Sequence, residues 1–457
     1  MTFAEQLKEE RTGIMYDIYE NRIPKRVPIE FSVGPVVIAD LAGIDRFEAF
    51  WNPEILKDAL DDFYSKVKAD TSMFWGGVYT PYSAQALNAR NRAISSTGMM
   101  QHPNTMCMYP EEYDEFIEDP LAFVVEKAFP RVYGYLDNSQ FPARSALAVF
   151  QEAKMTEQMN SRIGKMVWEM DSKYGKPDYE PNVGGFSRVP LDWMADQLRS
   201  FDGISIDIRR NRAKVIAAEE AAYPILYKVG LPADPAHPNR HGAMSFQLHM
   251  APYMRDKDFE DVWYAPWKRQ LEDYASLGMR CGAFLEEDWS RRLDYLLDLP
   301  TGMVYQWEKG DPRLFKDKLG KKCILSGGFP IIYLKTLSKS EIVDKTKEWL
   351  DIMMDGGAYI FGFDKNALSG GDINMENLIA VFDTVLEYGV YSDAGKQTGE
   401  IFKKEDYSFS DPAPVSSRAY ISWEKYKEMY PYTPESAKNT VMAMEDMLLN
   451  TVFYMSC

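Results

Sequence analysis

Residues 323–363, CILSGGFPIIYLKTLSKSEIVDKTKEWLDIMMDGGAYIFGF, decide the fold class because they read as strand, helix and strand. The apolar runs 323–327 and 358–363 have the length of buried strands. Between them, Ser338 and Glu341 predict a helix start, since each side chain can bond the free backbone N–H of the other residue. Apolar side chains then recur at helical spacing until a Gly-Gly pair ends the helix. The stretch therefore predicts two parallel strands joined by a helix.

The same alternation extends along much of the chain. Further apolar runs of strand length occur at 27–32, 72–75, 244–249, 280–285 and 303–307. Repeated strand–helix units are typical of a parallel sheet covered by helices, and about 250 residues of them can close into a barrel. We predict one (β/α)8 TIM barrel domain over residues 1–457, with a large helical insertion around 100–240, where the rhythm breaks. The alternative is an open doubly wound sheet, which is disfavoured because no GxGxxG follows the first strand.

Composition limits the class of protein. The 457 residues include 52 Lys and Arg against 69 Asp and Glu, a net charge of −17, so nucleic acid is an unfavourable ligand. No apolar run approaches the ~20 residues of a membrane span, and the polar N-terminus has no signal-peptide core. Four widely spaced cysteines fit a reducing compartment, so we expect a cytoplasmic protein. The 25 Met residues and the aromatic content suit a pocket for a flat apolar group, although most are expected in the core.

Barrel enzymes carry their catalytic groups at the carboxyl ends of the strands, which selects candidates by position. These are Glu30, His249, the acidic run 286–288, Asp311 and Asp364. Each also has a structural interpretation: a hydrogen-bonded histidine, a solvated acidic loop, or an aspartate that caps the next helix. His249, Glu286 and Asp364 stand at three strand ends, so their side chains could meet on the barrel axis. Imidazole nitrogen and carboxylate oxygen bind divalent metals such as zinc, which would polarise a substrate oxygen.

Longer motifs carry a resemblance to a known family. They are LGMRCGAFLEEDWSRRLDYL (277–296), CILSGGFPIIYLKTLSKSEIV (323–343) and GGAYIFGFDKNALSGGDINMENLIAVFDTVLEYG (356–389). Together with the opening EERTGIMYDIYENRIPKRVPIEF (9–31), they resemble the uroporphyrinogen decarboxylase superfamily, and most of all its corrinoid-dependent methyltransferase branch. The resemblance covers the C-terminal half well and the first strand region loosely, and it implies a (β/α)8 barrel.

The family pattern also implies ligands. In the coenzyme M methyltransferases of that branch, zinc is bound by a His-x-Cys motif at the fifth strand and by a cysteine after the eighth. The matching positions here read Phe284-Leu285-Glu286 and Asp364, so two carboxylates stand in place of thiolates. Such a harder site suits an oxygen substrate, for example a methoxy or phenolate group. The resemblance thus implies roles for Glu286 and Asp364, and with the strand-end position of His249 we expect Glu286 and His249 to be catalytic and His249, Glu286 and Asp364 to bind zinc.

The branch implies O-demethylation in an anaerobe, in which a methoxylated aromatic substrate passes its methyl group to a corrinoid. The chain has no DxHxxG corrinoid-binding segment, so a partner protein would carry the corrinoid. Four aromatic residues and one strand-end carboxylate are expected to bind the substrate: Phe74, Trp75, Tyr79, Tyr82 and Asp311. Two alternatives stay open, a lyase that decarboxylates a tetrapyrrole and a non-catalytic tetrapyrrole-binding barrel. The lyase ranks lower because its substrate-binding arginines near the first strand are missing. A homodimer is also left open.

Overall fold

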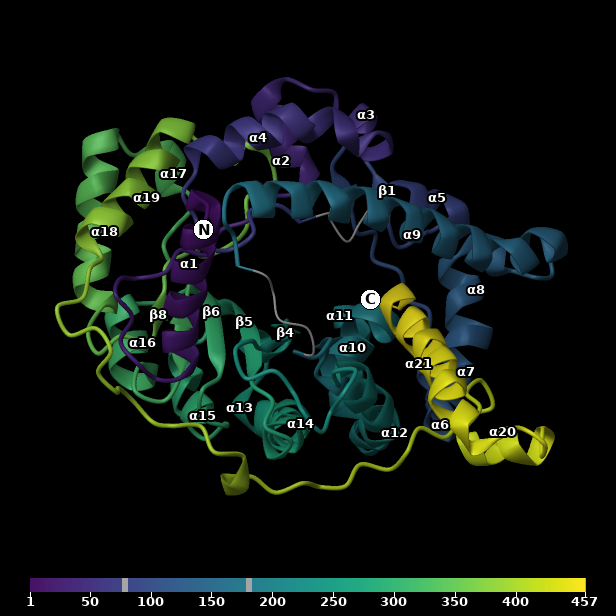
Figure 1. Cartoon of the computed structure of the whole chain (residues 1–457). Helices are drawn as coiled ribbons and strands as arrows, with labels where there is room; N and C mark the ends of the chain where they lie inside the picture. The colour runs from purple at the N-terminus through teal and green to yellow at the C-terminus, as the bar shows by residue number, and fades with distance from the viewer. Residues whose placement is uncertain (76–80, 178–182, 457) are drawn as a thin grey trace.

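The computed structural model describes residues 1–75, 81–177 and 183–456 (Figure 1). Its centre is a six-stranded parallel sheet whose spatial order, β3-β4-β5-β6-β7-β8, is also the order along the chain. This arrangement confirms the predicted α/β class. The strands are β3 (Phe186–Ser187), β4 (Met244–Leu248), β5 (Cys281–Asp288), β6 (Val304–Lys309), β7 (Ile324–Ser326) and β8 (Tyr359–Ile360).

Two N-terminal segments extend this sheet beyond β8. Ile29 bridges Phe361, and Val33 bridges Phe74, both in the parallel sense. The six strands and these two segments thus lie side by side in parallel orientation. Within the described ranges, no strand pairing joins Phe74 to β3, so the structure establishes a parallel sheet and leaves its closure into a barrel unshown.

Helices between the strands cover the outer face of the sheet. α18 begins with the predicted capping box, in which the Glu341 N–H donates to Ser338 Oγ (3.4 Å) and the Ser338 N–H donates to Glu341 Oε2 (2.9 Å). α18 then packs against α16 and α19 through its buried apolar stripe. The covering helices are α13 (Asp256–Phe259), α14 (Ala265–Ser276), α15 (Leu293–Leu297), α16 (Pro312–Leu319), α17 (Tyr333–Thr336), α18 (Lys339–Met353) and α19 (Met375–Tyr388).

Burial alternates along β5 and distinguishes the two faces of the sheet. Cys281, Ala283 and Leu285 are buried on the helix side, whereas Phe284 and Glu286 are partly exposed on the inner side. β4 shows the same period of two, with every second residue exposed. The inner face of the sheet therefore carries partly exposed side chains, and it is the face that can contact a ligand.

Residues 100–240 are largely helical, as predicted, but they also contribute β3. The sequence did not indicate this strand, because a strand of two residues leaves no readable alternation. The longer helices here are α6 (Tyr113–Glu118), α9 (Pro142–Lys173), α10 (Pro190–Met194), α11 (Ser200–Arg210) and α12 (Arg212–Gly230), with α7 (Pro120–Phe123) and α8 (Phe129–Val132) between them. In Figure 1, α9 runs past the sheet and projects to the right.

The two ends of the chain pack on different parts of the molecule. α1 (Phe3–Tyr19) lies at the amino ends of the strands, where Ile18 and Tyr19 pack with Ile324 and Ile360. α21 (Lys438–Met455) follows a long connection and packs against α12. The remaining elements are α2 (Pro35–Ala42), α3 (Arg46–Trp51), α4 (Lys57–Lys66), α5 (Pro81–Leu87), α20 (Trp423–Met429) and the antiparallel pair β1 (Ala93–Ile94) and β2 (Met100–Gln101).

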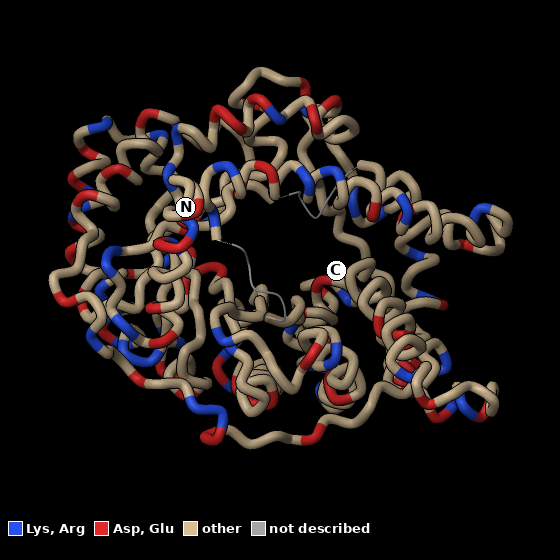
Figure 2. The backbone as a smooth tube through the Cα atoms, viewed as in Figure 1, with Lys and Arg blue, Asp and Glu red and all other residues tan. Residues whose placement is uncertain are grey.

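Charged residues lie mainly along the outer helices, where acidic and basic positions are interspersed along the chain (Figure 2). The net charge of −17 is thus spread over the surface. None of the helices in the described parts of the chain combines the length and the apolar character of a membrane span.

Candidate functional site

The carboxyl ends of β4 and β5 bring two of the predicted residues together. His249 directly follows β4, and Glu286 lies near the end of β5. His249 Nδ1 lies 3.0 Å from Asp196 Oδ2, and its Nε2 lies 3.8 Å from Glu286 Oε2. The first distance is a hydrogen bond and the second is longer than one. The imidazole is therefore held through one nitrogen, while the other faces a carboxylate across a small gap.

The fully buried Asp192 fixes the backbone on which His249 stands. Its carboxylate accepts the backbone N–H groups of His249 (3.1 Å) and Met250 (3.0 Å) and the indole N–H of Trp263 (2.9 Å). Burial raises the pKa of Asp192 to about 6, although its hydrogen bonds and His249 act in the opposite direction. Three donors on one buried carboxylate leave the strand end little freedom, so the imidazole starts from a defined position.

Asp196 stands in a π-helical turn, Ala195–Arg199, that follows α10. It is largely buried and also forms an ion pair with Arg188, which comes directly after β3. Ser200 ends the turn with a positive φ of 62°, a backbone region that costs a non-glycine residue free energy. Such π turns are frequent at functional sites, and here the turn directs the Asp196 carboxylate toward His249.

The surroundings set the protonation of the pair. Burial lowers the pKa of His249, but the hydrogen bond and charge of Asp196 together with the charge of Asp192 outweigh it, so the net shift is upward. Burial raises the pKa of Glu286, the neighbouring carboxylates add to the rise, and His249 opposes it. The upward shift favours the protonated imidazole of His249, which is the form that can act as a general acid. The stacked ring of Phe201 forms one wall beside His249, with ring centroids 6.4 Å apart.

A β-bulge at the end of β5 separates the roles of two adjacent glutamates. The pairing with β6 shifts register between Leu285 and Asp288, and Glu287 has a φ of +62°. The Glu287 N–H donates to Glu308 Oε2 (3.0 Å), and the Glu287 carboxylate forms an ion pair with Lys309 (2.6 Å). The bulge thus allows Glu286 to face His249 while Glu287 forms an ion pair near solvent.

The predicted zinc site is not assembled. Asp364 is buried, and its Oδ1 accepts the backbone N–H of Ile331 (2.9 Å), so it fixes the turn after β7. No three His, Cys, Asp or Glu side chains within residues 1–75, 81–177 and 183–456 are grouped so that they could hold a metal ion. The donor set of His249, Glu286 and Asp364 therefore does not fit a metal in this arrangement, and Asp364 has a structural role instead.

The predicted substrate-binding residues are dispersed. Asp311 caps α16, since its carboxylate accepts the Arg313 N–H (2.9 Å), which is the alternative interpretation of an aspartate after a strand. Phe74 is 3% exposed and belongs to the core. Tyr82 is also buried, with its ring 6.2 Å from that of Trp51. Trp75 remains partly exposed, and its role stays a prediction. Tyr79 lies outside the described residues.

Three residues of the site were missed by the sequence analysis: Arg188, Asp192 and Asp196. They follow β3, which is too short to be recognised, so no strand end pointed to them. One signal was available. Asp192 and Asp196 are four residues apart, which places two carboxylates on the same side of a helical segment. An acidic pair at that spacing beside an apolar segment would have been a reasonable candidate.

Comparisons with known proteins add little. No protein-family model matches the chain, and no curated protein matches it. Among solved structures, a methyltransferase from Methanosarcina mazei is similar, with 15% sequence identity, coverage of 82% of this chain and 98% of that chain, and a TM-score of 0.49. A likeness of this degree assigns neither an activity nor a ligand to the chain.

Proposed function

We propose that this protein is a methyltransferase that removes the methyl group of a methoxylated aromatic compound, with a reduced corrinoid on a partner protein as the acceptor. The observation that carries the proposal is the His249 imidazole, hydrogen-bonded to Asp196 and facing Glu286 at the carboxyl ends of parallel strands. The sequence resemblance of residues 277–389 supplies the reaction class. In this proposal the imidazole is the proton donor for the oxygen that leaves when the ether is cleaved.

We further infer that the sheet closes into a (β/α)8 barrel. Eight parallel positions in chain order, with helices on the outer face and an accessible inner face, are the components of such a barrel. Closure would place Arg188, His249 and Glu286 at the same mouth. This geometry supports a substrate that enters from the carboxyl ends of the strands.

The chemical problem is the leaving group. When the C–O bond of an aryl methyl ether breaks, the electron pair goes to the oxygen, and the methyl group goes to the acceptor. The corrinoid, when present, supplies the nucleophile. The oxygen leaves more readily if it receives a proton as charge develops, and a positioned general acid typically contributes about 10²–10⁴ in rate.

His249 is placed to deliver that proton from Nε2. With Nδ1 engaged by Asp196, a protonated imidazole presents Nε2–H toward the gap beside Glu286. The upward shift of its pKa favours the protonated form, and Asp196 stabilises the cation before transfer. Glu286 lies next to the same gap, where its negative charge favours the imidazolium form of His249.

The test uses purified protein with chemically reduced free cobalamin and a panel of methoxylated aromatics under anoxic conditions. We expect stoichiometric appearance of the phenol, by chromatography, and of methylated corrinoid, by absorbance. In the same mixture, His249→Gln should release phenol about 10²–10⁴ more slowly than the wild type. Absence of phenol with every methoxylated compound, also after addition of corrinoid proteins from methoxyl-using anaerobes, would overturn the proposal.

A further inference from the structure

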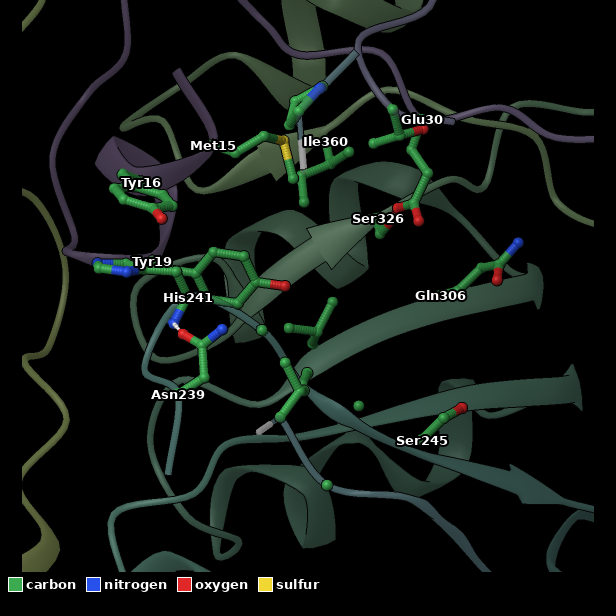
Figure 3. A pocket seen from close by; sticks show the side chains of 18 of the residues that line it. Met15, Tyr16, Tyr19, Glu30, Asn239, His241, Ser245, Gln306, Ser326 and Ile360 are labelled. Atoms are coloured by element: carbon green, nitrogen blue, oxygen red, sulfur yellow. Dashed lines mark hydrogen bonds between the residues drawn. The ribbon is translucent and has the colours of Figure 1, made fainter. Parts of the chain in front are cut away.

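A second polar region lies on the amino-end side of the sheet, away from the His249–Glu286 pair. A cavity of about 630 Å³ is bounded by α1 on one side and by inward-facing residues of β4 to β8 on the other (Figure 3). Its volume is within the range of small-molecule sites, which is about 300–1,000 Å³. The proposed mechanism does not use this space, although Glu30 and other lining residues belong to the sequence motifs 9–31 and 277–296.

Among the described residues that line the cavity, the one carboxylate is that of Glu30, from the first parallel segment. The hydroxyl of Ser326 donates to Glu30 Oε2 at a long 3.3 Å, and Figure 3 shows the two side chains meeting at one side of the cavity. The Glu30 side chain is exposed to the cavity, while desolvation by the protein atoms around it raises the pKa of its carboxyl. In the described parts of the chain, no Lys, Arg or His forms an ion pair with Glu30. A carboxylate in such a position is stabilised most by a cation.

The other walls favour an aromatic or apolar body. They are formed largely by side chains such as Met15, Tyr19, Phe284, Val304 and Ile360. At the opposite side from Glu30, Tyr16 stacks on His241 with ring centroids 3.7 Å apart. None of the described lining residues is Lys or Arg. Aromatic faces attract organic cations, and a wall without basic residues gives a carboxylate ligand no counter-charge.

We propose that this cavity binds a small aromatic ammonium ion, with the ammonium group on Glu30 and the ring among Met15, Tyr19 and Phe284. The ammonium donates to the Glu30 carboxylate, while the Ser326 hydroxyl keeps its oxygen in place. The ring fills the apolar part of the cavity. Ligands with a carboxylate in place of the ammonium are excluded, because both the cavity and the acidic chain repel them.

This binding does not depend on the proposed methyl transfer. Phe284 in the cavity and Glu286 at the reaction site stand on the same face of β5, about 7 Å apart at the rise of a strand. The cavity is therefore a neighbour of the site and not the gap between His249 and Glu286. A ligand without a methoxy group can test it separately from turnover.

The test is isothermal titration of the full chain at neutral pH with three matched probes: tryptamine, tryptophol and indole-3-acetate. They share an indole ring and differ in the charge of the terminal group. We expect tryptamine to bind at least about tenfold more tightly than tryptophol, since charge-assisted hydrogen bonds are roughly twice as strong as neutral ones. Indole-3-acetate should bind most weakly. Equal affinity for tryptamine and indole-3-acetate, or no binding of any probe at millimolar concentration, would overturn the proposal.

Variants then locate the site. Glu30→Gln should weaken tryptamine about tenfold and tryptophol less than about twofold, whereas Glu111→Gln, an exposed glutamate outside the cavity lining, should change neither. Ser245→Phe places a ring in the cavity and should abolish binding of both probes. Circular dichroism checks each fold. An unchanged preference for tryptamine over tryptophol in Glu30→Gln would contradict the proposed site. If Glu30→Gln fails to fold, Ser245→Phe gives the test instead, and unchanged tryptamine affinity in Ser245→Phe would contradict the proposed site.

Discussion

The two ends of the parallel sheet each carry a histidine paired with a carboxylate, and the surroundings of the two pairs differ. At the carboxyl end, His249 bonds to Asp196, which is only 9% exposed. At the amino end, His241 lies 3.0 Å from Glu20, which is 43% exposed, and its ring stacks on Tyr16. The same pair of residue types thus stands in two different environments.

The difference teaches what makes a histidine–carboxylate pair useful for chemistry. Water screens an exposed carboxylate, so the ion pair of Glu20 with His241 is weak and serves mainly to orient the ring. A buried carboxylate is screened much less, and Asp196 raises the pKa of His249 against the effect of burial. His249 also has a second carboxylate, Glu286, beside its other nitrogen. We therefore assign proton transfer to His249 at the carboxyl end, and to His241 at the amino end the role of lining the cavity.

The comparison fails if both histidines matter equally. His249→Gln removes the proton donor while keeping a polar side chain of similar length, so methyl transfer should fall by about 10²–10⁴. His241→Gln is the matched control and should retain activity within about threefold, since its ring does not face the reacting gap. Initial rates of phenol release measure both. Similar losses in the two variants would remove the basis for assigning chemistry to one end.

The adjacent glutamates of the bulge sharpen the assignment within the carboxyl end. Glu286→Gln removes the carboxylate beside Nε2 and should lower the rate by about 10², at the low end of the range for such groups. Glu287→Gln removes an exposed ion pair with Lys309 and should leave the rate nearly unchanged. Rate measurements on the two variants, with melting curves as a check on folding, compare them. A larger loss of rate for Glu287→Gln would mean that Glu287, and not Glu286, faces His249.

The support beneath His249 is open to a stability measurement. Asp192→Asn replaces an acceptor by an N–H₂ group that faces a backbone N–H, so one buried donor is left unsatisfied. We expect about 1–3 kcal/mol lower free energy of unfolding in urea at pH 7. Asp202→Asn, at an exposed position of α11, should differ from the wild type by less than about 0.5 kcal/mol. Equal stability of the two variants would show that Asp192 does not fix the strand end.

The pH dependence tests the partner of His249. The folded pKa of His249 is raised, so its pair with Asp196 is fully stabilising below the unfolded pKa and is lost as pH rises through the folded one. Activity that needs the imidazolium should fall over the same alkaline window. Asp196→Asn removes the main raising influence and leaves burial, so the alkaline limb of the rate profile should move to lower pH. An unmoved limb would assign it to another group.

The smallest expected effect concerns a residue that we predicted to bind substrate. Asp311→Ala removes the cap of α16 and should destabilise the fold by about 1 kcal/mol, with kcat and KM unchanged. Thermal unfolding and steady-state kinetics measure the two quantities. A raised KM with unchanged stability would restore the original assignment to the substrate pocket.

The sequence predictions that the structure confirms rest on patterns between residues that are close in the sequence. The capping box of Ser338 and Glu341 and the apolar runs of β5 to β8 are short-range patterns, and the structure confirms them. His249 and Glu286 were found because parallel strands align their carboxyl ends at one edge.

What could not be predicted depends on contacts between distant segments. Asp196 reaches His249 across 53 residues of chain, through a π turn that has no sequence signature. Asp311 and Asp364 occupy strand ends as expected, but each carboxylate accepts a nearby backbone N–H instead of facing the others. A short polar side chain after a strand satisfies local backbone donors at little entropic cost, and position alone cannot distinguish that role from ligation.

Proton delivery by His249 is tested most directly by the dependence of the methyl transfer rate on the pKa of the phenol that is released. A series of ring-substituted anisoles, with the same corrinoid acceptor, gives this slope for the wild type and for His249→Gln. If His249 protonates the leaving oxygen, the wild-type rate should vary little with the phenol pKa, whereas the variant should strongly prefer acidic phenols. The same steep slope in both proteins would contradict the role that we assign to His249.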